Sequence, residues 1–203
     1  MRRRGFTLVE LMAVVAILGV LTSIAVAAIQ NMVRVGVVNG GASSSSRLLS
    51  NARLRAMTMR CPVFVQFNGP SFSPGSPPPG FPFARNAIFV VMKGDCNSTN
   101  MFFEGDGSGP LPDDRVVANF PLDPRLVVNF PTAMVMGGKL TNQSVTIGWA
   151  GNPALPKVST VDTGGGPSTV SVSLIDISFA ASSGGAATRH TYVPDIGLAY
   201  TDY

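Results

Sequence analysis

One uninterrupted apolar stretch near the N-terminus limits what this chain can fold into. The stretch from Leu11 to Ile29 carries no charge, and Phe6 to Leu8 extend it on the N-terminal side. About 20 such residues span a bilayer as an α-helix. Three arginines, Arg2 to Arg4, precede the stretch, and the positive-inside rule then keeps the N-terminus in the cytoplasm. The sequence therefore predicts one membrane-crossing helix, with the rest of the chain on the far side.

Glu10 is an unexpected residue at the start of this stretch, because a carboxylate in lipid is costly. A secretory signal peptide is the alternative interpretation, since Ala25, Ala27 and Ala28 resemble a small-residue cleavage site. Such a peptide gains nothing from an acid near the front of its apolar segment. A buried charge is tolerated when it is paired, so Glu10 favours a segment in which its carboxylate meets a partner.

The residues that lead up to Glu10 carry a specific resemblance. The run Arg4-Gly5-Phe6-Thr7-Leu8-Val9-Glu10 resembles the type III signal of type IV pilin-like proteins, in which a short basic leader ends in glycine. The resemblance implies that prepilin peptidase cuts after Gly5 and that the new N-terminal Phe6 is N-methylated. It also implies that Glu10 neutralises the Phe6 amine of a neighbouring subunit in the assembled fibre. The physical argument agrees, because the cut creates an amine with which the acid can pair.

The sequence after the apolar stretch predicts that the helix continues into the rest of the chain. Four apolar residues recur at the spacing of one helical face, and four arginines fall mainly elsewhere, on an expected solvated surface. The apolar residues are Leu49, Ala52, Ala56 and Met59, and the arginines are Arg47, Arg53, Arg55 and Arg60. We interpret this segment as an amphipathic half-helix whose apolar side packs on a sheet.

Gly40-Gly41 and the four serines that follow Ala42 interrupt the helical pattern, because each glycine costs a helix about 1 kcal/mol relative to alanine. Either the helix continues with a weak point, or it breaks and Ser45 or Ser46 caps a second helix. We expect one long, locally weakened helix from Phe6 to about Met59, roughly 80 Å in length. Pro62 ends it, because proline disfavours a helical conformation in the residue before it.

From Val63 onward the pattern changes to short apolar runs separated by glycine and proline, which is typical of β-strands. The expected strands are Val63–Phe67, Ala87–Met92, Arg125–Phe130, Ser144–Ala150, Val170–Phe179, Thr188–Val193 and Ile196–Thr201. A proline-rich surface loop is expected over residues 68–83. One N-terminal helix followed only by antiparallel strands is an α+β fold, with the long helix packed on an antiparallel β-sheet domain.

The sequence predicts four parts in chain order. Residues 1–5 are the leader peptide, residues 6–29 the transmembrane and assembly helix, residues 30–60 the amphipathic half of the helix, and residues 61–203 the β-rich globular domain. Many major pilins have a proline two-thirds of the way along the apolar helix, but residues 24–28 contain none, so no kink is expected.

The same plan resembles a minor branch of the pilin-like proteins. Ala52-Arg53 and Arg55-Ala56 before Pro62-Val63, and the late strands that end in residues 195–198, resemble the H-type minor pseudopilins and related minor pilins, the GspH/FimT-like branch. The resemblance implies a pilin fold and a minor role in the fibre.

Cys61 and Cys96 are the two cysteines of the chain. In a cytosolic protein both would be buried free thiols, but in an exported chain a disulfide between them is the better expectation. The chain has no CxxC spacing and His190 is its single histidine, so we expect no zinc site. The acidic residues between positions 95 and 123 follow no EF-hand pattern, so we expect neither a calcium site nor a cofactor.

The sequence contains no recognisable catalytic constellation, and we expect no enzyme. His190 could act in a triad only if serine and aspartate partners met it in space, and no GxSxG motif is present. The formal net charge of +4 includes Arg2 to Arg4, so a chain without them would carry +1. That charge gives no general attraction for nucleic acid, which is therefore not an expected partner.

Residues and resemblance together predict a minor pilin or pseudopilin. Such a subunit enters a type IV pilus or a type II secretion pseudopilus through its N-terminal helix, and primes assembly or lies near the tip. The implied partners are other pilin or pseudopilin subunits, prepilin peptidase, the inner-membrane assembly platform and, before assembly, the lipid bilayer. The implied location is the bacterial inner membrane, with the C-terminal domain in the periplasm, and then the fibre. The alternatives are a minor pilin that binds DNA for uptake and an exported enzyme with an uncleaved anchor.

Overall fold

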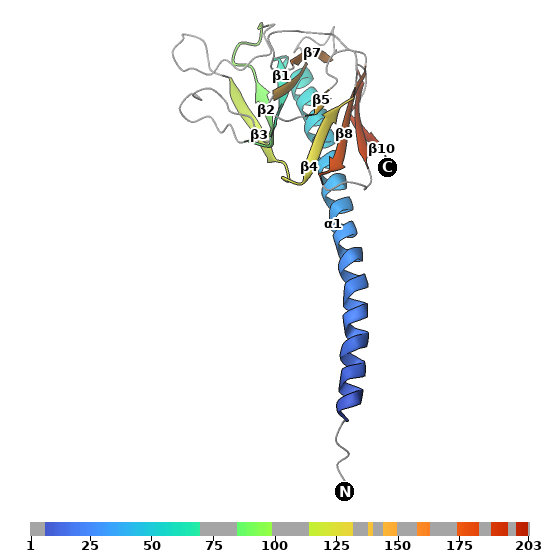
Figure 1. Ribbon diagram of the computed structural model, residues 1–203. Helices are drawn as coiled ribbons and strands as arrows, with labels where there is room; N and C mark the ends of the chain where they lie inside the picture. The colour runs from blue at the N-terminus through green and yellow to red at the C-terminus, as the bar shows by residue number, and fades with distance from the viewer. Residues whose placement is uncertain are drawn as a thin grey trace.

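The protein has the outline of a stalk with a head at one end (Figure 1). The computed structural model describes residues 7–69, 85–98, 114–131, 138–139, 144–149, 158–162, 174–182, 188–194 and 198–202. One helix, α1 (Leu8–Met59), has 52 residues and is therefore about 78 Å long. Strands surround only its second half, so its first half projects from the head.

The described strands form two five-stranded antiparallel sheets that pack on the second half of α1. The first sheet has the order β3-β2-β1-β6-β7 and the second the order β10-β9-β8-β4-β5. This arrangement confirms the α+β class. The strands are β1 (Val63–Asn68), β2 (Ala87–Met92), β3 (Arg115–Pro121), β4 (Leu126–Phe130), β5 (Gly138–Lys139), β6 (Ser144–Trp149), β7 (Val158–Asp162), β8 (Leu174–Ala181), β9 (Arg189–Pro194) and β10 (Tyr200–Asp202).

Each strand expected from the sequence has a counterpart, but three further strands were not expected. β3 and β7 lie at the two edges of the first sheet, and β5 lies at an edge of the second. β3 ends in Pro121, and an edge strand tolerates a proline because one of its sides has no strand to bond. The expected proline-rich loop lies almost entirely outside the described residues, as do residues 170–173 and 196–197 of the expected late strands.

α1 is continuous through Gly40-Gly41, so the expected single helix is confirmed and no second helix begins at the serines. Gly41 is buried where the helix meets β4, and a Cβ atom there would lie 2.5 Å from Cδ2 of Leu126. A Cβ atom on Gly40 would meet no atom within 4 Å. The Ser45 hydroxyl donates to the Gly41 carbonyl oxygen at 2.8 Å instead of capping a helix. Gly41 therefore lets helix and sheet approach closely.

Polar side chains on the second half of α1 hold it to the second sheet. The hydroxyls of Ser46 and Ser50 donate to the carbonyl oxygen of Ala199, at 3.0 and 3.3 Å. Arg53 was expected on a solvated surface, but it is buried, and its Nη1 donates to the carbonyl oxygen of Pro194 at 3.0 Å. The sequence pattern did not indicate this role. An arginine that donates to backbone carbonyl oxygens cannot be distinguished from a surface arginine by its position in the pattern.

The end of α1 also departs from the expected pattern. Met59 was placed on the buried face but is 61% exposed, because the helix ends there. Arg60 follows in the left-handed conformation, with φ 53° and ψ 32°, a common way to close a helix. Pro62 lies two residues further on, as expected for a residue that cannot continue a helix.

The segments after α1 and after β2 are tied together by covalent and ionic links. A disulfide joins Cys61 to Cys96. Beside it, the N–H of Lys93 donates to the carbonyl oxygen of Pro62 at 2.9 Å. The Lys93 Nζ lies 2.9 Å from Asp114 Oδ2, and these side chains are 0% and 3% exposed. These links fasten the end of the helix to the first sheet.

Candidate functional site

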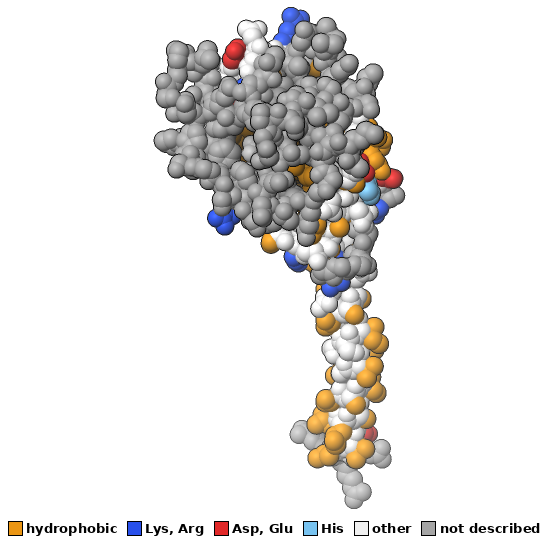
Figure 2. Space-filling view, turned by 45° about the horizontal axis from the view of Figure 1, so that its top comes forward, with side chains coloured by type: hydrophobic (Ala, Val, Ile, Leu, Met, Phe, Trp, Pro, Cys, Tyr) orange, Lys and Arg blue, Asp and Glu red, His pale blue; other side chains and the backbone are white. Residues whose placement is uncertain are grey.

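The first half of α1 is an apolar surface that no described residue covers. Fifteen large apolar side chains between Leu8 and Val33 are each at least 43% exposed. Figure 2 shows these side chains along the visible length of the stalk. A helix that is apolar all round is stable only when it is buried in protein or in lipid. The segment is also long and apolar enough to cross a membrane.

Glu10 interrupts this apolar surface at its N-terminal end and forms a capping box with Thr7. The Glu10 Oε2 accepts hydrogen bonds from the N–H and from the hydroxyl of Thr7, each at 3.0 Å. The Thr7 Oγ1 in turn accepts from the Glu10 N–H at 3.3 Å. A carboxylate in the first turn also interacts favourably with the positive end of the helix dipole.

The capping box gives the carboxylate a local partner in the single chain. Sequence reasoning missed Thr7, although the spacing Thr-x-x-Glu before an apolar run is a recognised signal for this motif. The side chain expected to contact a neighbour is therefore already held in a defined position at the tip of the helix.

Gly5 and Phe6, the expected cleavage and methylation residues, lie outside the described residues. α1 begins at Leu8, two residues after Phe6, and Thr7 is its extended N-cap with φ −74° and ψ 150°. A cut after Gly5 would leave a free amine one residue before the backbone N–H that Glu10 accepts. The spacing places an acid and a potential amine at the same end of one apolar rod.

His190 does not belong to a triad in the described part of the chain. Its Nδ1 lies 2.8 Å from Oδ1 of Asp176, and its ring stacks on Tyr192 with a centroid distance of 6.0 Å. No described serine hydroxyl is hydrogen-bonded to the ring, so the nucleophile that such a triad requires is not in place among the described residues. The pair links β8 to β9 on the surface of the second sheet.

The described acids of the 95–123 stretch are each engaged by protein groups. Asp95 accepts from the N–H of Asn97, Asp114 pairs with Lys93, and Asp123 pairs with Arg125. Hydrogen bonds from Arg125 hold the pKa of the Asp123 carboxyl below its usual value. Among the described residues no group of three or more His, Cys, Asp or Glu side chains is arranged to hold a metal ion. Residues 99–113, with the other acids of this stretch, lie outside the described residues.

Comparison with known proteins gives a match at the N-terminal end of the chain. Residues 1–26 match the family model described as the prokaryotic N-terminal methylation motif. The matched range contains the three leader arginines, Gly5, Phe6, Glu10 and most of the uncharged stretch. Neither the search of curated proteins nor the search of solved structures gives a significant match.

Proposed function

We propose that this chain, whose type IV prepilin signal at residues 1–26 supports a type IV pilin-like protein, is a minor pilin or pseudopilin. Its function would be structural: it enters a type IV pilus or a type II secretion pseudopilus through α1. One observation carries the proposal, namely a prepilin signal that leads directly into an uncovered apolar helix with Glu10 in its first turn.

The apolar surface of α1 restricts the route to such a fibre. Fully burying one large apolar side chain contributes about 1.5–3 kcal/mol, so the fifteen side chains, which are on average about 60% exposed, represent about 14–27 kcal/mol. A free chain in water would lose this stabilisation, which exceeds the stability of a typical domain. The helix must therefore pass from lipid directly into contact with other apolar helices. This requirement supports a membrane-anchored precursor and an assembly platform in the membrane.

In this proposal, Glu10 sets the axial position of each subunit relative to its neighbour. Prepilin peptidase cuts after Gly5, and the Phe6 amine of one subunit then meets the Glu10 carboxylate of the next. Phe6 and Glu10 are four residues apart, which is about 6 Å along a helix, so the pairing fixes a small axial offset between helices. A mismatched offset leaves a charge without its partner in an apolar environment, which is strongly unfavourable. Until then the Thr7 contacts occupy the carboxylate.

The minor role is the finer part of the proposal. Residues 24–28 contain no proline, and α1 is an unbroken helix from Leu8 to Met59. We place the subunit at the priming step or near the tip, with the β-rich head directed into the periplasm before assembly. We further propose that the chain has no enzymatic activity.

DNA capture is the less favoured function, because the exposed arginines of α1 do not form a stripe. Arg47 and Arg55 are exposed, but they lie about 80° apart around the axis, and the exposed Arg60 lies beyond the end of the helix. Arg53 is buried, and Asp176 pairs with the histidine of the late strands. Salt-sensitive retardation of a DNA duplex by the purified chain would reverse this order of preference.

Intact-mass measurement of the full chain tests the proposed processing. In a host that contains prepilin peptidase, the mature chain is expected to begin at methylated Phe6, and a host without the peptidase should retain residues 1–5. A chain that begins after Ala27 or Ala28 would instead identify an ordinary secretory signal and refute the proposal. Glu10→Leu tests the next step: processing should continue while incorporation into the fibre falls sharply.

A further inference from the structure

A hollow of about 290 Å³ lies at the junction of α1 and the base of the head. The helix contributes Ile29, Val33 and Val37, which follow one another at four-residue intervals, and also Gln30 and Arg34 from the adjacent row. The head contributes Arg125 and Ala181 from the second sheet and the turn before it. The hollow therefore has an apolar wall and two arginines among its lining residues. Figure 2 shows Lys and Arg side chains at the base of the head, where the apolar stalk emerges.

The position of this hollow along the helix corresponds to the headgroup layer of a membrane. The segment from Leu8 to Ile29 covers about 33 Å of helix, close to the roughly 30 Å hydrocarbon core of a bilayer. Arg34 is five residues beyond Ile29, about 7.5 Å further along the axis. The headgroup layer adds about 5–8 Å on each side, so Arg34 reaches the depth of the lipid phosphates.

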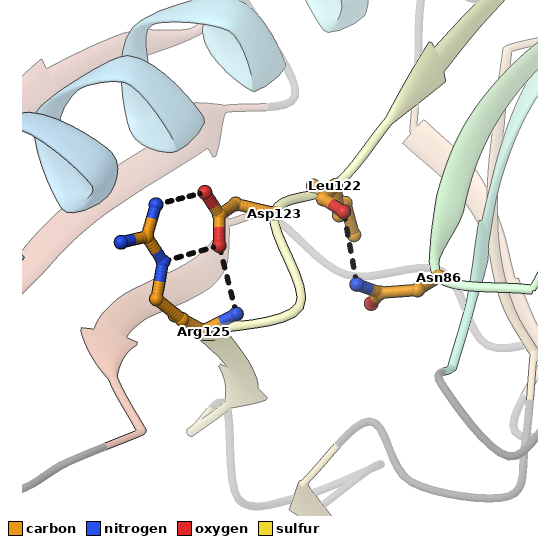
Figure 3. A network of polar contacts seen from close by, with 4 residues as sticks. All are labelled: Asn86, Leu122, Asp123 and Arg125. Atoms are coloured by element: carbon orange, nitrogen blue, oxygen red, sulfur yellow. Dashed lines mark hydrogen bonds and ion pairs between the residues drawn. The ribbon is translucent and has the colours of Figure 1, made fainter.

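Arg125 is held in place by its surroundings, as Figure 3 shows. Its Nε and Nη2 donate to Oδ1 and Oδ2 of Asp123, at 3.0 and 2.8 Å. The turn is anchored to the residue that precedes β2. The Asn86 Nδ2 donates to the carbonyl oxygen of Leu122 at 3.0 Å (Figure 3). The Leu122 N–H donates back to the carbonyl oxygen of Asn86 at 2.8 Å. Arg125 keeps further N–H donors beyond the two that Asp123 accepts.

The charge of the hollow is positive. No hydrogen bond or ion pair joins the Arg34 side chain to a described residue, whereas Asp123 neutralises the charge of the Arg125 guanidinium. The hollow thus carries a formal net charge of about +1 next to an apolar wall. Guanidinium groups bind phosphate oxygens in a bidentate manner, and an apolar wall beside them suits the upper part of an acyl chain.

We propose that this hollow binds the phosphodiester headgroup of an anionic phospholipid while the subunit is anchored in the membrane. The inference rests on the proposed membrane anchoring of α1. The headgroup contacts Arg34 and Arg125, and the acyl chains run along the helix on the side of Ile29. The bound lipid would fix the depth and tilt of the head against the membrane surface before assembly.

Native mass spectrometry of the full chain tests the proposal, in micelles that contain equal amounts of phosphatidylglycerol and phosphatidylcholine. Phosphatidylglycerol adducts are expected to exceed phosphatidylcholine adducts about fivefold, the effect of one net positive charge near a lipid surface. Arg34→Gln should remove this preference, and Asp123→Asn should increase it. Arg47→Gln is the matched control, because Arg47 is an exposed arginine of the same helix about 20 Å from Arg34.

Other outcomes would overturn the proposal. An equal loss of preference in Arg34→Gln and Arg47→Gln would mean that net charge alone attracts the lipid. Displacement of the adducts by millimolar inorganic phosphate would identify a site for free anions. Unchanged adducts together with poor fibre incorporation of Arg34→Gln would assign the hollow to a neighbouring subunit. Carbonate-resistant insertion into vesicles is measured in parallel, and its failure for the unsubstituted chain would refute the membrane anchoring of the proposed function instead.

Discussion

The two adjacent glycines of α1 should respond in opposite ways to the same substitution. Alanine in a helix interior is more favourable than glycine by about 1 kcal/mol. The environment of Gly40 is open, so Gly40→Ala should raise the free energy of unfolding by about 1 kcal/mol. Gly41 faces Leu126, where a new methyl group would lie 2.5 Å from Cδ2. The pair therefore separates helix propensity from packing at neighbouring positions of one helix.

The expected size of the packing effect follows from the position of Leu126. This side chain is only 7% exposed and belongs to the main core cluster, so its movement away from a new methyl group disturbs other buried residues. Overpacking of this kind costs about 1–3 kcal/mol. Gly41→Ala should therefore be less stable than Gly40→Ala by about 1–3 kcal/mol, since both gain the same helix propensity. Relative to the unsubstituted chain, Gly41→Ala should change the free energy of unfolding by between about zero and a loss of about 2 kcal/mol. This range is the packing cost minus the gain in helix propensity.

Thermal unfolding of the oxidised full chain in detergent measures this difference. Trp149 is the single tryptophan and is 2% exposed, so its fluorescence reports on the head. For a head of this size, 1 kcal/mol corresponds to about 2–4 °C. Gly40→Ala should melt about 2–4 °C above the unsubstituted chain, and Gly41→Ala about 2 °C or more below Gly40→Ala. Leu126→Ala should lower the melting temperature less in the Gly41→Ala background than in the unsubstituted chain, because it removes the side chain that clashes with the new methyl group. Equal melting temperatures for the two alanine variants would refute the packing argument.

Three further predictions concern the head. Asp114→Asn should lower the free energy of unfolding by about 3–5 kcal/mol in urea titrations, because it removes the carboxylate that pairs with the buried Lys93 ammonium, and adding Lys93→Met should recover part of this loss. Replacing Cys61 and Cys96 with serine should cost about 4 kcal/mol by the same measurement, since it opens a loop of sequence separation 35, and reductant should then have no additional effect. In circular-dichroism melts, Trp149→Phe should lower the stability less than half as much as Trp149→Ala. The indole N–H has no partner among the described residues, so phenylalanine keeps most of the buried ring and breaks no hydrogen bond there.

The sequence predicted the helix as a single element because the apolar stretch marks its first half and Pro62 marks its end, but it located the buried face only in part. The buried positions Val38, Ala42, Ser45, Leu49, Ala52 and Ala56 alternate by four and three residues. Only the last three were recognised. A small polar residue such as Ser45 carries no apolar signal, and its burial depends on a hydrogen bond to the Gly41 carbonyl within the helix. The packing role of Gly41 likewise depends on Leu126, which lies far along the chain in the second sheet.

The candidate site was easier to predict than the sheets, because its signal is contiguous. The prepilin signal lies within a few residues of Glu10, whereas the edge strands β3 and β7 depend on pairing partners far along the chain. The missed contributor, Thr7, was also local, and its spacing to Glu10 could have identified it. The junction hollow could not have been found from the sequence, since Arg34 and Arg125 come together only when the second sheet packs on the helix.

The two halves of α1 meet different requirements, and their residues differ accordingly. The first half presents large side chains on all sides, which suits lipid and then other apolar helices. The second half buries mainly small residues and uses Ser46, Ser50 and Arg53 to bind backbone carbonyls of the second sheet. These polar contacts need no matching side chain on the sheet. They add to the apolar core that the second half of α1 shares with both sheets. The head thus holds this half firmly and leaves the first half uncovered for lipid or for other apolar helices.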